Sequence, residues 1–132
     1  MTLRPFRMNQ DLELVNSWAN ARGMGSMPEH RLSRFGLIAV QGNKDIGACF
    51  LYPFKGSGWC MFECLMTNPD STAEERDQAM SMIFLELSNA ARILGYKEVF
   101  TTSYLPSVNN KLDSMGFIMN KDKVNHFIGR LV

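Results

Sequence analysis

Residues 59–103, WCMFECLMTNPDSTAEERDQAMSMIFLELSNAARILGYKEVFTTS, decide the fold of this chain. The apolar run Trp59 to Met66 predicts a strand, and Thr67 to Asp70 end it. From Ser71 to Leu94, apolar residues recur at helical spacing, and Glu98 to Ser103 is rich in β-branched and aromatic residues. A strand, a long helix and a strand with short connections predict a right-handed crossover between two parallel strands.

The start of this long helix carries two overlapping capping signals. Ser71 precedes Glu74 by three residues, and Thr72 precedes Glu75 by three residues. A hydroxyl and a carboxylate at that spacing satisfy each other's backbone N–H groups at a helix N-terminus. The sequence therefore predicts a capped start, with either pair as the capping box.

Shorter elements flank the crossover on both sides. We expect a short strand at 2–7, then a helix capped by Asn9 or Asp11 and stopped by Gly23. Two strands at 35–41 and 45–52 follow as a hairpin around residues 42–44. After the crossover we expect a helix at 106–115 and a closing hairpin of 117–120 and 124–131 around 121–123. The order predicts an α/β (α+β) domain over 1–132, with a mixed, mostly antiparallel twisted sheet of about six to seven strands and helices on both faces.

Composition excludes several functional classes. The chain has 132 residues, 45% of them apolar and 20% charged, with a net charge of +1. No basic field indicates a nucleic-acid partner, and no apolar run approaches the roughly 18 residues that span a membrane. Three cysteines without a signal peptide predict reduced thiols in the cytoplasm.

The element order, together with three short motifs, resembles the GNAT superfamily of N-acetyltransferases. The motifs are Asp45-Ile46-Gly47-Ala48 in the hairpin, Thr67-Asn68-Pro69 after the next strand, and Met115-Gly116-Phe117 after the last helix. The resemblance implies a GNAT-like domain that moves an acetyl group from acetyl-CoA to a primary amine, on a small molecule or a protein, without a metal. It also leaves room for a homodimer.

Two residues are candidates for the chemistry. Glu63 interrupts an apolar strand, where a carboxylate is costly unless it is paired or lies in a cleft. Tyr104 follows a strand and precedes Pro106, at the carboxyl end of a sheet where ligands commonly bind. The resemblance implies that Glu63 takes the amine proton, directly or through water, and that Tyr104 protonates the CoA thiolate. A solvent-facing or paired Glu63 and a packed loop Tyr104 are the alternative interpretations.

The resemblance also implies residues that hold the cofactor. Backbone groups of Leu65, Met66 and Thr67 would contact the pantetheine arm, and Ser103 lies beside Tyr104. Where the family has a glycine-rich pyrophosphate loop, residues 75–80 contain no glycine, and Leu112 stands where many members have a tyrosine. Either Ser71, Thr72 and Arg76 take the pyrophosphate one turn earlier, or CoA binds poorly.

Two further interpretations stay open. The missing glycines also fit an inactive GNAT-like binding or structural module, or a CoA-binding regulator without turnover. Cys60 and Cys64, expected on one strand face, could join Cys49 and His126 in a zinc site. Core thiols are the stronger prediction, because no tight Cys pair lies on a turn.

Overall fold

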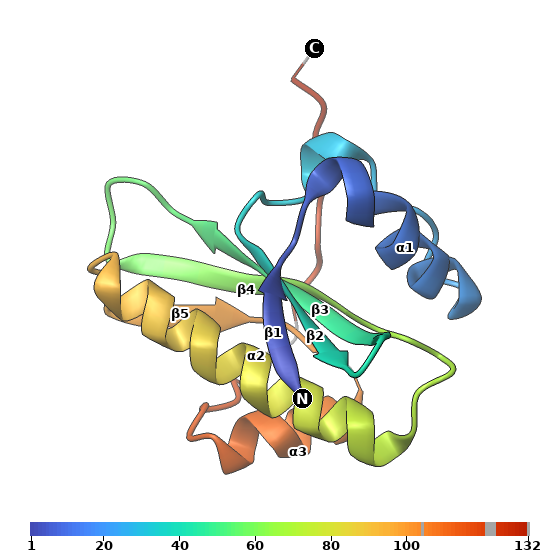
Figure 1. The fold of residues 1–132 in the computed structure, drawn as a ribbon. Helices are drawn as coiled ribbons and strands as arrows, with labels where there is room; N and C mark the ends of the chain where they lie inside the picture. The colour runs from blue at the N-terminus through green and yellow to red at the C-terminus, as the bar shows by residue number, and fades with distance from the viewer. Residues whose placement is uncertain (104, 121–123, 132) are drawn as a thin grey trace. The chain divides into compact units, whose positions relative to one another are not determined.

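The computed structural model describes residues 1–103, 105–120 and 124–131. They fall into two compact units, Met1–Thr102 and Ser103–Val132. The first unit holds a five-stranded sheet in the order β1-β2-β3-β4-β5 (Figure 1). Its strands are β1 (Thr2–Pro5), β2 (Gly36–Gln41), β3 (Lys44–Pro53), β4 (Trp59–Thr67) and β5 (Glu98–Thr101). The first three pairs are antiparallel and β4 pairs parallel with β5, so the sheet is mixed and mostly antiparallel.

Helices connect these strands as the hydrophobic periodicity predicts. Helix α1 (Met8–Ala21) and a 3-10 turn, η1 (Glu29–Arg31), lie between β1 and β2, and α2 (Ala73–Ile93) joins β4 to β5. The parallel crossover is therefore confirmed. In the second unit, α3 (Pro106–Ser114) begins at a proline, which suits a first-turn position that needs no N–H donor.

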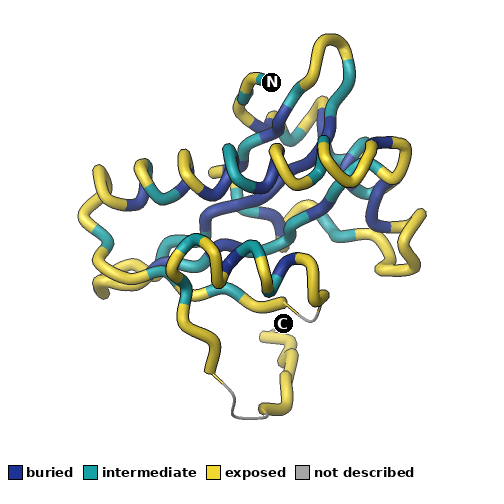
Figure 2. Tube along the Cα trace, turned by 90° about the horizontal axis from the view of Figure 1, so that it is seen from below, coloured by how far each residue is buried: buried dark blue, intermediate teal, exposed yellow. Residues whose placement is uncertain are grey.

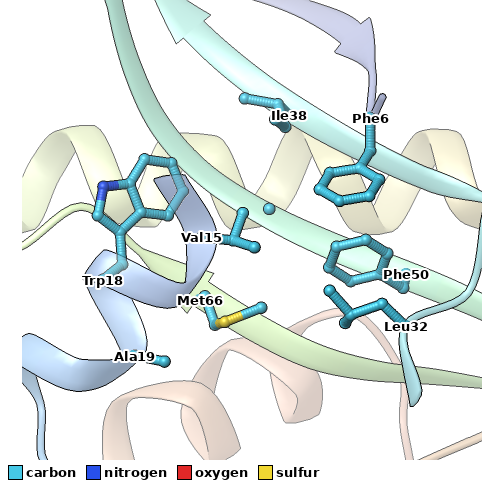
Figure 3. Close-up of a cluster of buried hydrophobic side chains, with 9 residues drawn as sticks. Phe6, Val15, Trp18, Ala19, Leu32, Ile38, Phe50 and Met66 are labelled. Atoms are coloured by element: carbon cyan, nitrogen blue, oxygen red, sulfur yellow. The ribbon is translucent and has the colours of Figure 1, made fainter. Parts of the chain in front are cut away.

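One face of the sheet packs against α1. Val15, Trp18 and Ala19 of α1 lie against Ile38 of β2 and Phe50 of β3 (Figure 3). The rings of Phe6 and Phe50 meet edge to face, with centroids 4.8 Å apart. A Cβ on Gly36 would lie 2.5 Å from the Phe50 ring, so glycine is required there for this packing.

The opposite face packs against α2. Strand residues alternate in direction, so Gly47 faces α2 while its neighbour Ala48 belongs to the α1 cluster. Phe62 of β4 stacks on Phe84 of α2 at 6.4 Å. Buried residues therefore run through the middle strands and along one side of each of these two helices (Figure 2). Helices on both faces of the sheet are confirmed.

An ion pair fixes the first strand to the first helix. Arg4 donates to both carboxylate oxygens of Asp11, each at 2.9 Å, and the Arg7 N–H donates to Asp11 Oδ2 at 2.8 Å. Burial opposes ionisation of Asp11, but these donors hold its pKa below the usual range. The sequence predicted Asp11 as a residue that caps the helix from the position before it, but that position is occupied by Arg7. Asp11 lies within the first turn, and its carboxylate accepts the Arg7 N–H.

The predicted closing hairpin was wrong for the residues that are described. Residues 117–120 and 124–131 contain no strand, and the turn at 121–123 lies outside the described residues. Ile118, Phe127, Ile128 and Leu131 are exposed. Apolar alternation predicts a strand only where a sheet receives it, and a two-stranded hairpin alone is marginally stable in water. The described sheet therefore has five strands and not the expected six to seven.

No helix in the described part of the chain is long and apolar enough to cross a membrane.

Candidate active site

The parallel pairing of β4 and β5 stops halfway along β4. The two strands are in register from Trp59 opposite Glu98 to Phe62 opposite Thr101, and no later pair follows. Strand β4 continues to Thr67. One edge of β4 pairs with β5 up to Phe62. From Glu63 onward, that same edge has no strand partner among the described residues. Backbone N–H and C=O groups along such an edge are open to a ligand.

A bulge lies at the point where the two strands part. Along β3, Ala48 and Phe50 are two residues apart, whereas their partners on β4, Met66 and Glu63, are three apart. The extra residue strains the backbone, because Cys64 has a φ of 59°, a value that non-glycine residues rarely adopt. Such bulges redirect side chains, and they often lie next to functional sites.

The bulge changes which face each cysteine occupies. Cys60 lies before it, with its Sγ 3.7 Å from the Glu98 carbonyl, whereas Cys64 packs against the cluster that faces α1. The expectation that Cys60 and Cys64 share a face was therefore wrong, because the extra residue breaks the alternation. No metal-binding group of three or more His, Cys, Asp or Glu residues occurs in the described part of the chain.

The Cys64 thiol lies beside Tyr52 and is not set up as a nucleophile. Its Sγ is 3.4 Å from the Tyr52 hydroxyl, which donates to the Arg31 carbonyl at 2.7 Å. Burial raises the pKa of Cys64, and the nearby charge of Glu63 adds to the increase. The thiol is therefore protonated at neutral pH, whereas a nucleophilic cysteine needs a thiolate.

Glu63 lies at the same junction and is half-buried. Its Oε1 accepts the Thr102 N–H at 2.8 Å and the Thr102 hydroxyl at 2.7 Å. Thr102 directly follows β5, so this carboxylate bridges the two strands where their backbone ladder ends. The sequence pattern singled out Glu63 as a candidate, and its catalytic role stays a prediction; the pattern did not identify Thr102. The hydroxyl run Thr101-Thr102-Ser103 at the end of the strand was the available signal.

The remaining candidates along β4 have different surroundings. Met66 is buried in the α1 cluster, and Leu65 lies in the bulge, half-buried. The carbonyl and hydroxyl of Thr67 both accept from Arg22, at 3.3 and 2.8 Å. Sequence reasoning did not identify Arg22 as a partner of this strand.

The predicted pyrophosphate residues lie at the start of α2. The structure selects Thr72 and Glu75 as the capping box: Thr72 Oγ1 accepts the Glu75 N–H, and Glu75 Oε2 accepts the Thr72 N–H at 2.7 Å. Ser71 donates its hydroxyl to the Asn68 carbonyl, and Arg76 donates to the Ser71 carbonyl. Lys44 binds Glu75 at 3.2 Å, and the Thr72 N–H and Lys44 together lower the pKa of Glu75.

The two candidates after β5 belong to the second unit. Ser103 accepts the Leu105 N–H on its hydroxyl at 3.2 Å. Tyr104, the predicted acid, lies outside the described residues. Its role stays a prediction.

Solved structures share this fold, although the sequence matches neither a protein-family model nor a curated protein. The protein TTHA1254 from Thermus thermophilus aligns with a TM-score of 0.74 at 16% identity, over 98% of each chain. Rv2747 from Mycobacterium tuberculosis, solved with CoA, aligns at 0.74 and 15% identity, covering 95% of this chain and 76% of that one. A predicted acetyltransferase from Clostridium acetobutylicum, solved with acetyl-CoA, aligns at 0.67 and 15% identity, over 96% and 95%.

These likenesses define the class of the fold. The chain has the fold of the GNAT acetyltransferases over nearly its whole length. Identities of 15 to 16% establish the fold and do not by themselves assign an activity.

Proposed function

We propose that this protein is an acetyl-CoA-dependent N-acetyltransferase, with the acetyl group moving to a primary amine. The observation that carries the proposal is the parting of β4 from β5 after Phe62, together with the bulge at Cys64. A pantetheine arm carries two amides, which suit an open strand edge because they can continue its hydrogen-bond pattern. Proteins of this fold have been solved with CoA and with acetyl-CoA.

The chemistry requires a proton acceptor beside the thioester. In this proposal the amine nitrogen attacks the acetyl carbon, the carbon–sulfur bond breaks, and Glu63 takes the amine proton. Glu63 lies at the junction where the thioester would end if the arm follows β4. A positioned general base contributes roughly 10²- to 10⁴-fold to such a step.

The phosphates would bind at the first turn of α2. Arg76 supports this placement, because no carboxylate among the described residues neutralises its positive charge. Its guanidinium bonds only to the Ser71 carbonyl in that part of the chain. Apart from the Glu75 N–H, which the capping box uses, the first-turn amides of a helix also have no partner within the helix. Glu74 and Glu75 oppose an anion there, so the pyrophosphate would be held more weakly than the pantetheine arm.

The alternative is a GNAT-like module that binds a partner or CoA without turnover. The specific observation in its favour is the same helix start: the Thr72 N–H and Glu75 N–H are already bonded within the capping box. A phosphate that used these amides would have to displace the box.

Thermal unfolding with three ligands tests whether the protein binds the cofactor and which half of the cofactor it binds. Acetyl-CoA is the test ligand, while S-acetylpantetheine and 3′-phosphoadenosine diphosphate report on its two halves. A ligand that binds only the folded protein stabilises it by about 2.7 kcal/mol at one hundred times its dissociation constant. We expect acetyl-CoA and S-acetylpantetheine to raise the midpoint temperature of unfolding. We expect Arg76→Glu to weaken the response to acetyl-CoA and to leave the response to S-acetylpantetheine unchanged.

Turnover is then measured as release of the CoA thiol with a panel of primary amines. Thiol release that depends on an amine supports the enzyme. Stabilisation without release for any amine or peptide N-terminus supports the regulator or module. No stabilisation by either acetyl thioester contradicts the proposal.

A further inference from the structure

The contact between Glu63 and Thr102 uses only one of the two carboxylate oxygens. Both Thr102 donors, the N–H at 2.8 Å and the hydroxyl at 2.7 Å, reach Oε1. A carboxylate oxygen offers about two lone-pair positions. Thr102 therefore fills the hydrogen-bonding capacity of Oε1.

The second carboxylate oxygen, Oε2, differs from Oε1 in its hydrogen bonding. In the described part of the chain, no hydrogen bond or ion pair reaches Oε2 of Glu63. Within the described residues, the two oxygens of this carboxylate are thus unequal: Thr102 holds Oε1, and no partner is bonded to Oε2.

The backbone explains why Thr102 occupies this place. Phe62 and Thr101 form the last pair of the parallel ladder. One residue further on, the Thr102 N–H bonds to the Glu63 side chain instead of a β4 carbonyl. The side chain therefore serves as one more connection across the diverging strands, and its direction is fixed by the sheet itself.

We propose that Thr102 is a positioning residue for acetyl transfer, because it holds Oε1 so that Oε2 of Glu63 is the atom that takes the amine proton. This inference rests on the proposed function. The nitrogen–carbon bond forms as the carbon–sulfur bond breaks, the sulfur leaves as CoA thiolate, and the amine proton ends on Oε2. Thr102 itself touches no substrate.

The competing explanation is that the Glu63–Thr102 contact only joins the two strands and has no part in catalysis. Variants of Thr102 distinguish the positioning role from this structural role. Thr102→Val keeps the shape and the N–H but removes the hydroxyl donor, and Thr102→Ser restores that donor. Thr101→Val is the matched control, with the same chemical change one residue earlier in β5.

The test compares these three variants with the parent under steady-state conditions. We expect Thr102→Val to lower kcat by roughly tenfold, which is less than the loss of about 10²-fold or more expected on removal of the base itself, with KM for acetyl-CoA unchanged. Thr102→Ser returns kcat towards the parent value, and Thr101→Val matches the parent.

A second measurement is independent of turnover. Amide hydrogen exchange at Thr102 reports the N–H bond to Glu63, and we expect its protection to fall in Glu63→Ala and to persist in Thr102→Val. If Thr102→Val has the parent's kcat, the positioning role is overturned even though the Glu63–Thr102 contact is present. If the Thr102 amide is equally protected in Glu63→Ala, the contact itself is overturned. The third outcome is that protection of the Thr102 amide depends on Glu63 but neither the parent nor any variant shows turnover. That outcome overturns the proposed function, and with it the catalytic role.

Discussion

Glu63 is the residue on which the proposed chemistry depends most. It lies between apolar neighbours on β4, and its carboxylate is held at the end of β5 by Thr102. The sequence alone could identify it, because an acidic residue inside an apolar strand needs an explanation. The sequence could not supply the partner, since Thr102 is 39 residues away and meets Glu63 only through the crossover.

Replacing Glu63 by glutamine tests the base directly. Glu63→Gln keeps the size of the side chain but cannot accept the amine proton, so kcat should fall by about 10²-fold. Stabilisation by acetyl-CoA should stay at the parent level, because in the proposed complex the pantetheine arm contacts the β4 backbone and not the Glu63 side chain. Glu86→Gln, an exposed position on α2, is the control. A Glu63→Gln protein with the parent's kcat would contradict the assignment.

Arg4 and Asp11 make a second residue-scale prediction, for stability towards acid. Among the described residues, Arg4→Met leaves the Arg7 N–H as the remaining donor to the buried Asp11 carboxylate, and we expect a loss of about 2 kcal/mol in unfolding free energy near pH 7. The folded pKa of Asp11 is lowered. The stabilisation is therefore present above the unfolded value and is lost as pH falls through the folded value.

Urea unfolding at several pH values measures this difference. The gap between the parent and Arg4→Met should be full at pH 6 to 7 and close as the pH drops below about 4. Arg92→Met removes the same charge from an exposed helix position and controls for net charge. A gap that stays constant down to pH 3 would rule out the linkage.

Strand β4 carries the proposed base, and its geometry was only partly predictable. Hydrophobic patterning predicted its bounds within a residue, together with the parallel partner and the capped helix that follows. It did not predict the bulge, because Cys64 is neither glycine nor asparagine and carries no sign of a positive φ. Strict alternation without a bulge predicts Cys60 and Cys64 on the same face of β4, and this prediction was wrong.

Two substitutions at Cys64 separate backbone strain from burial. Valine suits the apolar surroundings better than asparagine, but a β-branched residue at a φ of 59° is strained, whereas asparagine tolerates it. We expect Cys64→Val to be less stable than Cys64→Asn by about 1–2 kcal/mol. Denaturant unfolding measures the difference, and a Cys64→Val protein at least as stable as Cys64→Asn would refute the strained bulge.

The whole molecule shows where sequence reasoning succeeds and where it stops. The crossover, the hairpin and both helical layers follow from local periodicity, capping and turn residues, which act over a few positions. The last predicted hairpin failed in the described residues, because strand propensity cannot say whether a sheet edge receives the segment. Its exposed apolar residues keep the homodimer open as a proposal that light scattering can test.

The central claim is that acetyl-CoA binds along the open edge of β4. Amide chemical-shift mapping of the isotopically labelled protein, titrated with acetyl-CoA, tests this claim most directly. The account predicts that the largest changes fall on residues 63–67 and on Thr102, with smaller changes at the first turn of α2. An absence of changes up to millimolar ligand, or changes confined to α1 and η1, would contradict it.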